Sequence, residues 1–213
     1  DWSTPNWVSW HLSLEDLGST PRQDDFRPND ALPSGWYQVQ NFSYNGGGFD
    51  RGHMCPSADR TATVPANSST FLMTNMVPQA PVCNQTTWAN LEDYARSLVT
   101  GTNKELYIIA GPAGTGGTGN SGLLNTIDNT RINVPASVWK VIVVLDNGSD
   151  DLNRINTSTR VISVIMPNSN TIGSNWRNYR VSVDDVEALT GYDLLSTLPT
   201  ATQTVIESRV DNL

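Results

Sequence analysis

The chain has 213 residues, a length that suits one domain with a single core, so we treat 1–213 as one unit. The hydrophobic fraction of 38% excludes a largely disordered chain, and because no apolar run approaches the ~20 residues of a spanning helix, we expect a soluble protein with no membrane partner. Thirteen Lys plus Arg against 21 Asp plus Glu give a net charge of −8, which argues against nucleic-acid binding through a broad basic surface.

Runs typical of β-strands recur along the chain. We expect an N-terminal strand that contains His11, which we interpret as a structural residue. Runs rich in β-branched or aromatic residues, each bounded by turn formers, predict further strands at Trp36 to Asn41, Phe71 to Asn75, Glu105 to Ala110, Trp139 to Asp146 and Arg160 to Met166.

Helical signals lie between and after these strands. Apolar side chains recur with helical spacing over Asn84 to Val99, which predicts a first helix there. A second helix is predicted to start after Ser182 and to end near Gly191, and a third covers Ala201 to Val210. Clustered strands with a few helices predict an α+β fold, in which a mainly antiparallel central sheet is flanked by helices.

The glycine-rich loop that follows the predicted strand at Glu105 to Ala110 is interpreted as a hairpin loop. It matches G-x-G-x-x-G from Gly114 to Gly119, but Gly117 stands where a phosphate-binding loop needs Lys. Ser121 in the same loop makes a serine hydrolase a competing class of enzyme. A zinc site is not expected, because it would need both His and both Cys at spacings unlike any usual zinc pattern.

The segment Asp50-Arg51-Gly52-His53 carries the strongest chemical signal. Side chains alternate along an extended chain, so Arg51 and His53 would point to the same face. A neutral imidazole can take a proton from water at neutral pH, and a nearby guanidinium can grip a phosphate oxygen. The segment therefore predicts a base and a cation in one site.

The segment from Asn84 to Glu92 supplies a second set of candidates. On a regular helix these two residues lie about 12 Å apart along the axis, so we do not expect both to bind one ion directly. Asn84 can offer an amide oxygen to Mg²⁺, while Glu92 reaches the waters of the ion or positions Arg96. The alternative is that Asn84 caps the helix and that Glu92 and Arg96 form a surface pair.

Together, these motifs resemble a known family. The runs Asp50 to Arg60, Thr74 to Gln79 and Asn84 to Glu92 are similar to the DNA/RNA non-specific endonucleases of the ββα-metal, or His-Me finger, type. The family includes secreted bacterial sugar-non-specific nucleases, which the chain resembles most, and mitochondrial endonuclease G. A D-R-G-H motif followed about 30 residues later by N-x7-E is more specific than either motif alone.

The resemblance implies an endonuclease that hydrolyses single- and double-stranded DNA and RNA to 5′-phosphate ends. Mg²⁺ is the implied cofactor, and Mn²⁺ would substitute for it. The resemblance makes His53 the general base, Asn84 the direct protein ligand of the metal, and Glu92 the acidic residue of the water network around the metal. A catalytically silent nucleic-acid-binding protein on the same fold is the alternative.

Further residues take roles from the same resemblance. Arg22, Arg51 and Arg96 match arginines that contact phosphate or stabilise the transition state. Asn75 lies in the N-x-x-P-Q segment of the family, and we expect it to support the active site and the bound substrate. A small protein inhibitor, found for some relatives, is a possible partner.

The two cysteines and the start of the chain lead to two further expectations. Cys55 lies two residues after the expected base and Cys83 one residue before the expected metal ligand, so we expect a disulfide that ties the two halves of the site together. The chain begins at Asp1 with no initiator Met, so we expect a mature form after signal removal, secreted or periplasmic.

Overall fold

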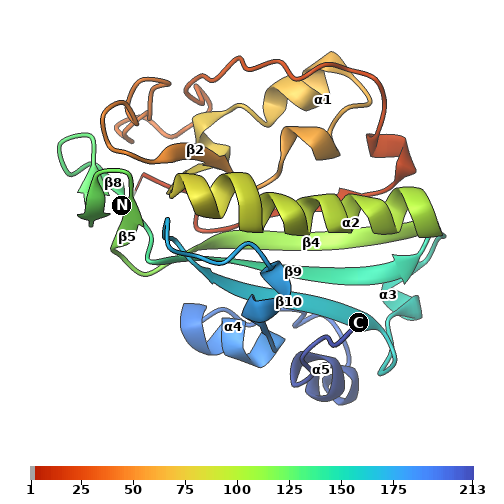
Figure 1. The fold of residues 1–213 in the computed structure, drawn as a ribbon. Coiled ribbons are helices and arrows are strands. Elements are labelled where there is room, and N and C mark those ends of the chain that lie inside the picture. Colours follow the sequence, from red (N-terminus) through yellow and green to blue (C-terminus); the bar gives the residue numbers. More distant parts are fainter. Residues whose placement is uncertain (1–2) are drawn as a thin grey trace.

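A five-stranded antiparallel sheet forms the centre of the protein in the computed structural model, which describes residues 3–213 (Figure 1). The strand order is β1-β4-β9-β10-β11, and every neighbouring pair is antiparallel. The strands are β1 (Val8–Leu12), β4 (Lys104–Ala113), β9 (Ser137–Asp146), β10 (Arg160–Pro167) and β11 (Arg180–Val181). The predicted α+β class and mainly antiparallel sheet are confirmed.

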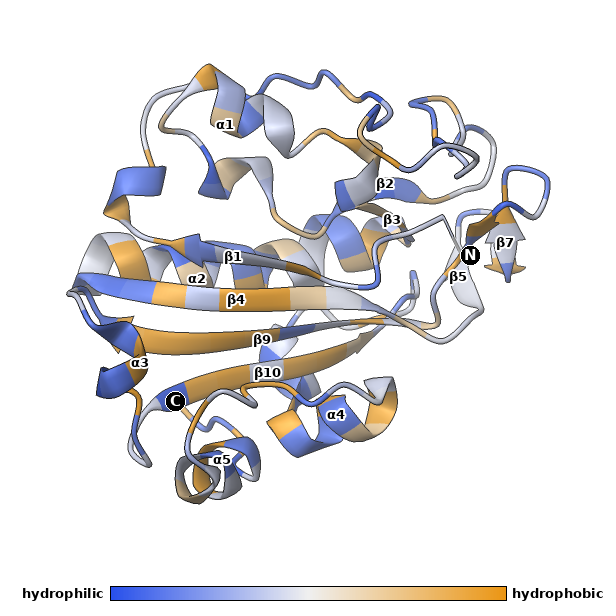
Figure 2. Cartoon of the chain, turned by 180° about the vertical axis from the view of Figure 1, so that it is seen from behind, coloured by the Kyte–Doolittle hydropathy of each residue, from blue (hydrophilic) through white to orange (hydrophobic). Residues whose placement is uncertain are grey.

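The central strand β9 sends its side chains alternately into two cores. Val138 and Ile142 belong to the core on the side of α2, whereas Trp139 and Val141 belong to the core on the opposite side. Figure 2 shows β9 and β10 as nearly continuous apolar strands. Because both faces of the sheet are covered, these two strands read in the sequence as long apolar runs.

Helices cover both faces of the sheet, as expected. α2 (Ala89–Thr102) lies along one face, and α4 (Val183–Thr190) and α5 (Thr200–Glu207) lie against the other (Figure 1). Two shorter helices are α1 (Val64–Ser69) and α3 (Asp151–Arg154). Within residues 3–213, no helix is both long enough and apolar enough to cross a membrane.

The ends of α4 show why its bounds could be predicted. Ser182 caps its N-terminus in a reciprocal capping box with Asp185, and Gly191 ends it in the left-handed conformation with φ of 75°. The predicted third helix is also present, but it begins at Thr200 and ends at Glu207, three residues before the predicted end.

Short strands and turns complete the fold. The glycine-rich loop forms the predicted hairpin, with strands β5 and β6. The remaining elements are β2 (Asp50–His53), β3 (Met76–Gln79), β5 (Gly117–Gly119), β6 (Gly122–Leu124), β7 (Thr126–Ile127), β8 (Ile132–Asn133), the 3-10 turns η1 (Leu14–Asp16), η2 (Ser57–Asp59), η3 (Met73–Asn75) and η5 (Trp176–Tyr179), and the π-helical segment η4 (Cys83–Trp88).

Two predicted strands are wrong. Trp36 to Asn41 is irregular, because Ser43 Oγ accepts a hydrogen bond from Gln40 N (3.2 Å) and holds the chain in a turn, while Trp36 is 65% exposed. Phe71 to Asn75 is a turn followed by η3, and the strand β3 begins only at Met76. In the second segment the backbone bonds Phe71 N to Ser68 O (3.1 Å) and Asn75 N to Leu72 O (2.8 Å) close turns in place of a strand.

Candidate active site

The D-R-G-H segment forms β2, which pairs antiparallel with β3. The segment η4 and then α2 follow β3, so the predicted site residues lie on two paired strands and the helix that follows them (Figure 2). Gly52 is required by this packing, because a Cβ at this position would lie 2.5 Å from the Cβ of Gln79. A larger residue would force the two strands apart.

His53 is buried at the end of β2, with 9% of its surface exposed. The ring of Phe71 lies 5.0 Å from its ring, centroid to centroid, at 86°, and the ring of Phe26 lies 5.7 Å away at 66°. Within residues 3–213, His53 Nε2 has no hydrogen-bond partner. The aromatic rings thus hold the imidazole, and Nε2 is buried and unpaired in this part of the chain.

The electrostatic surroundings keep His53 neutral. Burial, followed by the guanidinium of Arg22 and then that of Arg51, lowers the pKa of His53 to about 3. The Asp24 carboxylate and a hydrogen bond to the backbone of Arg51 act in the opposite direction. At neutral pH the ring is therefore neutral, and one of its nitrogens carries no proton.

The same two aromatic rings carry the arginines. The Arg51 guanidinium carbon lies 3.8 Å from the centroid of the Phe26 ring, and that of Arg22 lies 4.8 Å from the centroid of the Phe71 ring. Each ring that contacts His53 therefore also positions one cation. The prediction that Arg51 and His53 share a site agrees with this geometry, and Arg22 joins them from a distant segment.

Polar contacts fix both guanidinium groups but leave donors free. Arg22 Nε pairs with Asp24 Oδ1 (2.6 Å), and its Nη1 donates to Ser57 Oγ (3.1 Å). Arg51 Nη1 donates to the Asn41 carbonyl oxygen (3.3 Å). A guanidinium has five N–H donors, so each arginine retains donors for an anionic oxygen.

Asn84 is tied to the same strand by Asp50. Asn84 Nδ2 donates to Asp50 Oδ2 (2.8 Å), and Gln85 Nε2 donates to the same oxygen (2.8 Å). A carboxylate can pair only with the NH₂ end of the amide, so the Asn84 carbonyl oxygen Oδ1 is directed away from Asp50. A carbonyl oxygen is the type of ligand that Mg²⁺ prefers.

The alternative that Asn84 caps a regular α-helix is wrong. It lies inside η4, a π-helical segment, and its backbone N–H bonds to the Ala80 carbonyl oxygen (2.9 Å). A π-helical turn is wider than an α-helical turn, so the residues before Ala89 are rotated relative to the stripe of α2. The sequence predicted the helix but not this turn.

Glu92 faces the interior rather than solvent. Its Oε1 lies 3.4 Å from Lys140 Nζ, and Lys140 is 1% exposed with its Nζ 4.0 Å from the centroid of the Trp88 ring. Burial raises the pKa of Glu92 and the Asp59 charge adds to this effect, whereas Lys140 lowers it. Lys140 therefore offsets part of the effect of burial, and the pKa of Glu92 stays above its ordinary value.

Arg96 belongs to the same group of charges. Its Nη1 lies 2.8 Å from Asp59 Oδ1, and its Nη2 pairs with Asp93. Asp59 is 2% exposed and also accepts a hydrogen bond from Trp10 Nε1 (3.0 Å). The turn η2 therefore supplies the partner of Arg96 through Asp59, just as it supplies a partner of Arg22 through Ser57.

Asn75 holds the backbone that follows His53. Its Oδ1 accepts from Cys55 N (3.0 Å), and its Nδ2 donates to the carbonyl oxygens of Cys55 (2.8 Å) and Thr70 (2.8 Å). Both amide hydrogens are used in these bonds. The geometry therefore makes Asn75 a positioning residue for the end of β2, and the predicted contact with substrate stays a prediction.

The expected disulfide is wrong, because Cys55 and Cys83 are both free and buried. Cys83 Sγ accepts a contact from Gln79 Nε2 (3.6 Å). Burial raises the pKa of Cys55 to about 12, and the charge of Asp59 adds to this effect. The two thiols thus have different surroundings, and the hydrogen bonds of Asn75 and Asp50 connect the halves of the site instead.

Several residues that hold the site were not among the predicted site residues. Asp50 stood inside the D-R-G-H motif, and its charge next to an expected metal ligand could have indicated its role. Lys140 is a single charge in an apolar strand, which is a signal for a buried, paired residue. Nothing in the local sequence of Phe26 or Phe71 points to His53, because these contacts depend on tertiary packing.

The comparisons with known proteins agree with this geometry. A family model for DNA/RNA non-specific endonucleases matches residues 2–201. A nuclease of Nostoc sp. is 51% identical over 209 residues, which are 98% of this chain and 73% of that protein. Nuclease C1 of Cunninghamella echinulata is 30% identical over 92% of this chain and 78% of its own length. Human mitochondrial endonuclease G is 35% identical over 65% of this chain and 48% of its own length.

A solved structure has the same fold. It is a crystal structure of an endonuclease G in complex with its inhibitor, with a TM-score of 0.75 and 24% sequence identity over 93% of this chain and 81% of that chain. The fold and the site together define a nuclease of the ββα-metal type. The chain belongs to the DNA/RNA non-specific endonuclease family and is a hydrolase that acts on nucleic acids.

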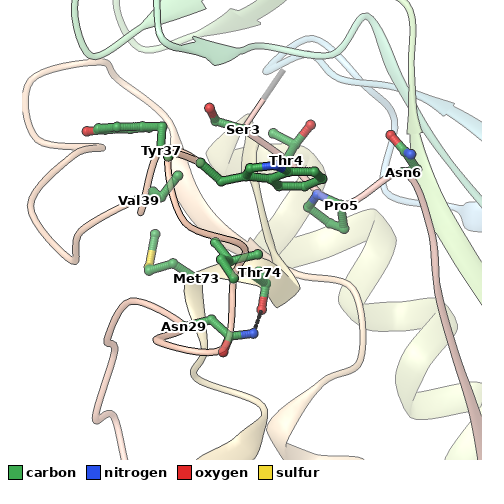
Figure 3. A pocket seen from close by; sticks show the side chains of 12 residues that line it. Ser3, Thr4, Pro5, Asn6, Asn29, Tyr37, Val39, Met73 and Thr74 are labelled. Carbon is green, nitrogen blue, oxygen red and sulfur yellow. Dashed lines mark hydrogen bonds between the residues drawn. The ribbon is translucent and has the colours of Figure 1, made fainter. Parts of the chain in front are cut away.

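A cavity of about 530 Å³ lies apart from these residues (Figure 3). The N-terminal segment, the loop that contains Asn29 and Tyr37, and the turn at Met73 and Thr74 line it, and Asn29 Nδ2 donates to Thr74 Oγ1 (3.2 Å). None of the predicted catalytic or metal-binding residues lines this cavity. The candidate active site is therefore an assembly of charged groups around His53 and lies outside this cavity.

Proposed function

We propose that this protein is a Mg²⁺-dependent, sugar-non-specific endonuclease that hydrolyses single- and double-stranded DNA and RNA and leaves 5′-phosphate ends. One observation carries the proposal: the buried, neutral His53, with Nε2 free, lies between two aromatic rings that each carry an arginine. A base and two cations in one place suit attack by water on a phosphodiester.

The chain's own residues account for substrate binding. The free donors of Arg22 and Arg51 bind the non-bridging oxygens of the phosphate and stabilise the charge that develops on them. Such contacts engage the backbone and neither the bases nor the 2′-hydroxyl. This geometry supports action on both DNA and RNA.

His53 acts as the base for the attacking water. Nε2 takes a proton from water while the water oxygen forms a bond to phosphorus, and the bond from phosphorus to the 3′-oxygen breaks. The 3′-oxygen leaves with a proton from solvent, so the products are a 3′-hydroxyl and a 5′-phosphate. The low pKa of His53 means that the ring carries no extra proton at neutral pH before this step.

The residues present suit a hard divalent cation. Asn84 Oδ1 would hold it, since Asp50 binds the NH₂ end of that amide, and Glu92, whose carboxylate lies 3.4 Å from Lys140 Nζ, would face the water shell of the ion. The ion supplies positive charge beside the phosphate when it is bound, and Mn²⁺ would substitute. Arg96, held by Asp59, adds positive charge on the same side as Glu92.

The test is cleavage of plasmid DNA and of single-stranded RNA by the purified chain, with Mg²⁺, with Mn²⁺ or with EDTA. We expect both substrates to be cleaved only when a metal is present. We also expect the DNA products to carry 5′-phosphate ends that a ligase can join. Intact substrates with both metals would contradict the proposed activity. The same proposal includes a secreted or periplasmic location, which cell fractionation tests. It also includes a small protein inhibitor as a partner, which co-purification tests.

A further inference from the structure

Three carboxylates meet between α4 and α5, on the opposite face of the central sheet from α2 (Figure 1). Asp184 and Glu187 lie three residues apart on α4, so their side chains share one side of that helix. Glu207 is the last residue of α5. One oxygen from each carboxylate lies within 4.8 Å of the other two.

Positive charge is missing from this cluster. Within residues 3–213, none of the three carboxylates forms an ion pair with Lys, Arg or His. Asp193 adds a further negative charge beside Glu207. Three or four carboxylates without a counter-charge repel one another, so an additional positive species is needed to stabilise their arrangement.

Glu207 is the member that points most clearly to a ligand. It is 7% exposed, and its Oε1 is buried without a hydrogen-bond partner in the described chain. Burial and then the charges of Glu187, Asp184 and Asp193 raise the pKa of Glu207 to about 7. A carboxylate that has one buried oxygen without a partner and lies beside two other carboxylates is a strong ligand for a cation.

We propose that Asp184, Glu187 and Glu207 form a structural site for a divalent cation, with Ca²⁺ the best fit. Ca²⁺ binds oxygens at about 2.3–2.6 Å, so two ligands on opposite sides of the ion lie about 5 Å apart, in line with the observed separation. One oxygen of Glu187 accepts from Leu194 N (2.6 Å), which holds its carboxylate in place. Asp184 is exposed, so water can complete the coordination.

Such a site would tie the C-terminal helix to the rest of the fold. α5 packs against α4 and β10, and Ile206, next to Glu207, is part of the second core. A cation bound only by the folded state stabilises that state in proportion to its occupancy. The cluster and His53 lie on opposite faces of the sheet, so this effect is separate from the nuclease reaction.

The test uses Asn84→Ala as the parent, because this change removes the expected ligand of the catalytic metal. After EDTA treatment and dialysis, thermal unfolding at neutral pH is followed with and without millimolar Ca²⁺, and calorimetric titration counts the bound ions. We expect a rise in Tm of several degrees and one Ca²⁺ per chain in the parent. Asp30→Asn, which removes an exposed carboxylate elsewhere, serves as the control and should behave like the parent.

The variants Glu207→Gln and Asp184→Asn should each lose the Ca²⁺-dependent rise in Tm. Asp184 is exposed, so its variant keeps the test valid even if Glu207→Gln does not fold. No rise in Tm in the parent, or an equal rise in Asp184→Asn, overturns the proposal. If the parent ignores Ca²⁺ while Glu207→Gln gains stability above neutral pH, the cluster is held by a proton on Glu207 and the metal site does not exist.

Discussion

The Asn84 side-chain amide donates a hydrogen bond to Asp50 at 2.8 Å, and this contact links the helix of the candidate site to its first strand. Asp50 stands three residues before the proposed base in the same strand, β2. One carboxylate therefore sets the orientation of the expected metal ligand and connects it to the strand that carries His53. Such an outer contact affects metal binding without touching the metal.

Replacement of Asp50 by Ala should weaken metal binding more than it slows catalysis. Without the carboxylate, the Asn84 amide can rotate, so the Mg²⁺ concentration for half-maximal cleavage should rise by about 10- to 100-fold. Cleavage rates measured over a Mg²⁺ titration test this, and Gln85→Ala, which removes the other amide bound to Asp50, is the matched control. An unchanged Mg²⁺ dependence in Asp50→Ala would show that the contact does not orient the ligand.

Phe26 should matter to the reaction although it carries no polar group. Phe26→Leu removes the ring under Arg51 and an edge contact with His53, each worth about 0.5–1.5 kcal/mol, so kcat/KM should fall by about 10-fold. Phe42→Leu is the control, because Phe42 is 61% exposed. Steady-state kinetics on DNA, with Tm as a check of folding, measure the effect. A kcat/KM equal to that of Phe42→Leu would contradict the positioning role.

The buried pair of Lys140 and Glu92 should show strong coupling. Lys140→Met leaves Glu92 buried without its cation and should cost about 3–5 kcal/mol of the free energy of unfolding. Glu92→Gln with Lys140→Met removes both charges, so the double variant should be more stable than Lys140→Met alone. Denaturant unfolding of the two single variants and the double variant measures the coupling. Additive effects would mean that the two side chains do not interact.

Much of the fold could be predicted where local and global preferences agree. A run of β-branched and aromatic residues placed β9, and the cap at Ser182 placed α4, because these signals are local. Trp36 and Phe71 have the same propensities as strand residues but lie in backbone turns, in which Trp36 N donates to the Pro33 carbonyl oxygen (3.1 Å) and Phe71 N to that of Ser68 (3.1 Å). The π-helical segment at Asn84 has no sequence signal that we used, and it changes the phase of the helix that was expected to be regular.

The candidate site could be predicted in part for the same reason. Arg51 and His53 are two residues apart on one strand, so the period of an extended chain predicts that they point to the same face. The surroundings of Glu92 depend on Lys140, almost fifty residues further along the chain, and no local pattern predicts that contact. The cysteines show the limit of spacing arguments, because nearness to the site in sequence did not bring their side chains together.

The low pKa of His53 predicts how stability changes in acid. An unfolded histidine binds a proton near pH 6.5, whereas folded His53 does so only near its pKa of about 3. Between these values the unfolded state binds more protons, so the free energy of unfolding should fall as the pH is lowered, by at most about 1.4 kcal/mol per pH unit from this residue. Urea unfolding from pH 7 to 5 should therefore show a steeper loss for the wild type than for His53→Gln. Parallel curves would contradict the low pKa.

The most direct test of the account is rescue of His53→Ala by imidazole. The variant should cleave plasmid DNA with Mg²⁺ about 100- to 10,000-fold more slowly than the wild type, because it lacks the base. Added imidazole should restore part of the rate in proportion to its neutral form, since it can take the proton of the attacking water in the space left by the side chain. A variant that cleaves within tenfold of the wild type without imidazole would contradict the assignment of His53 as the general base.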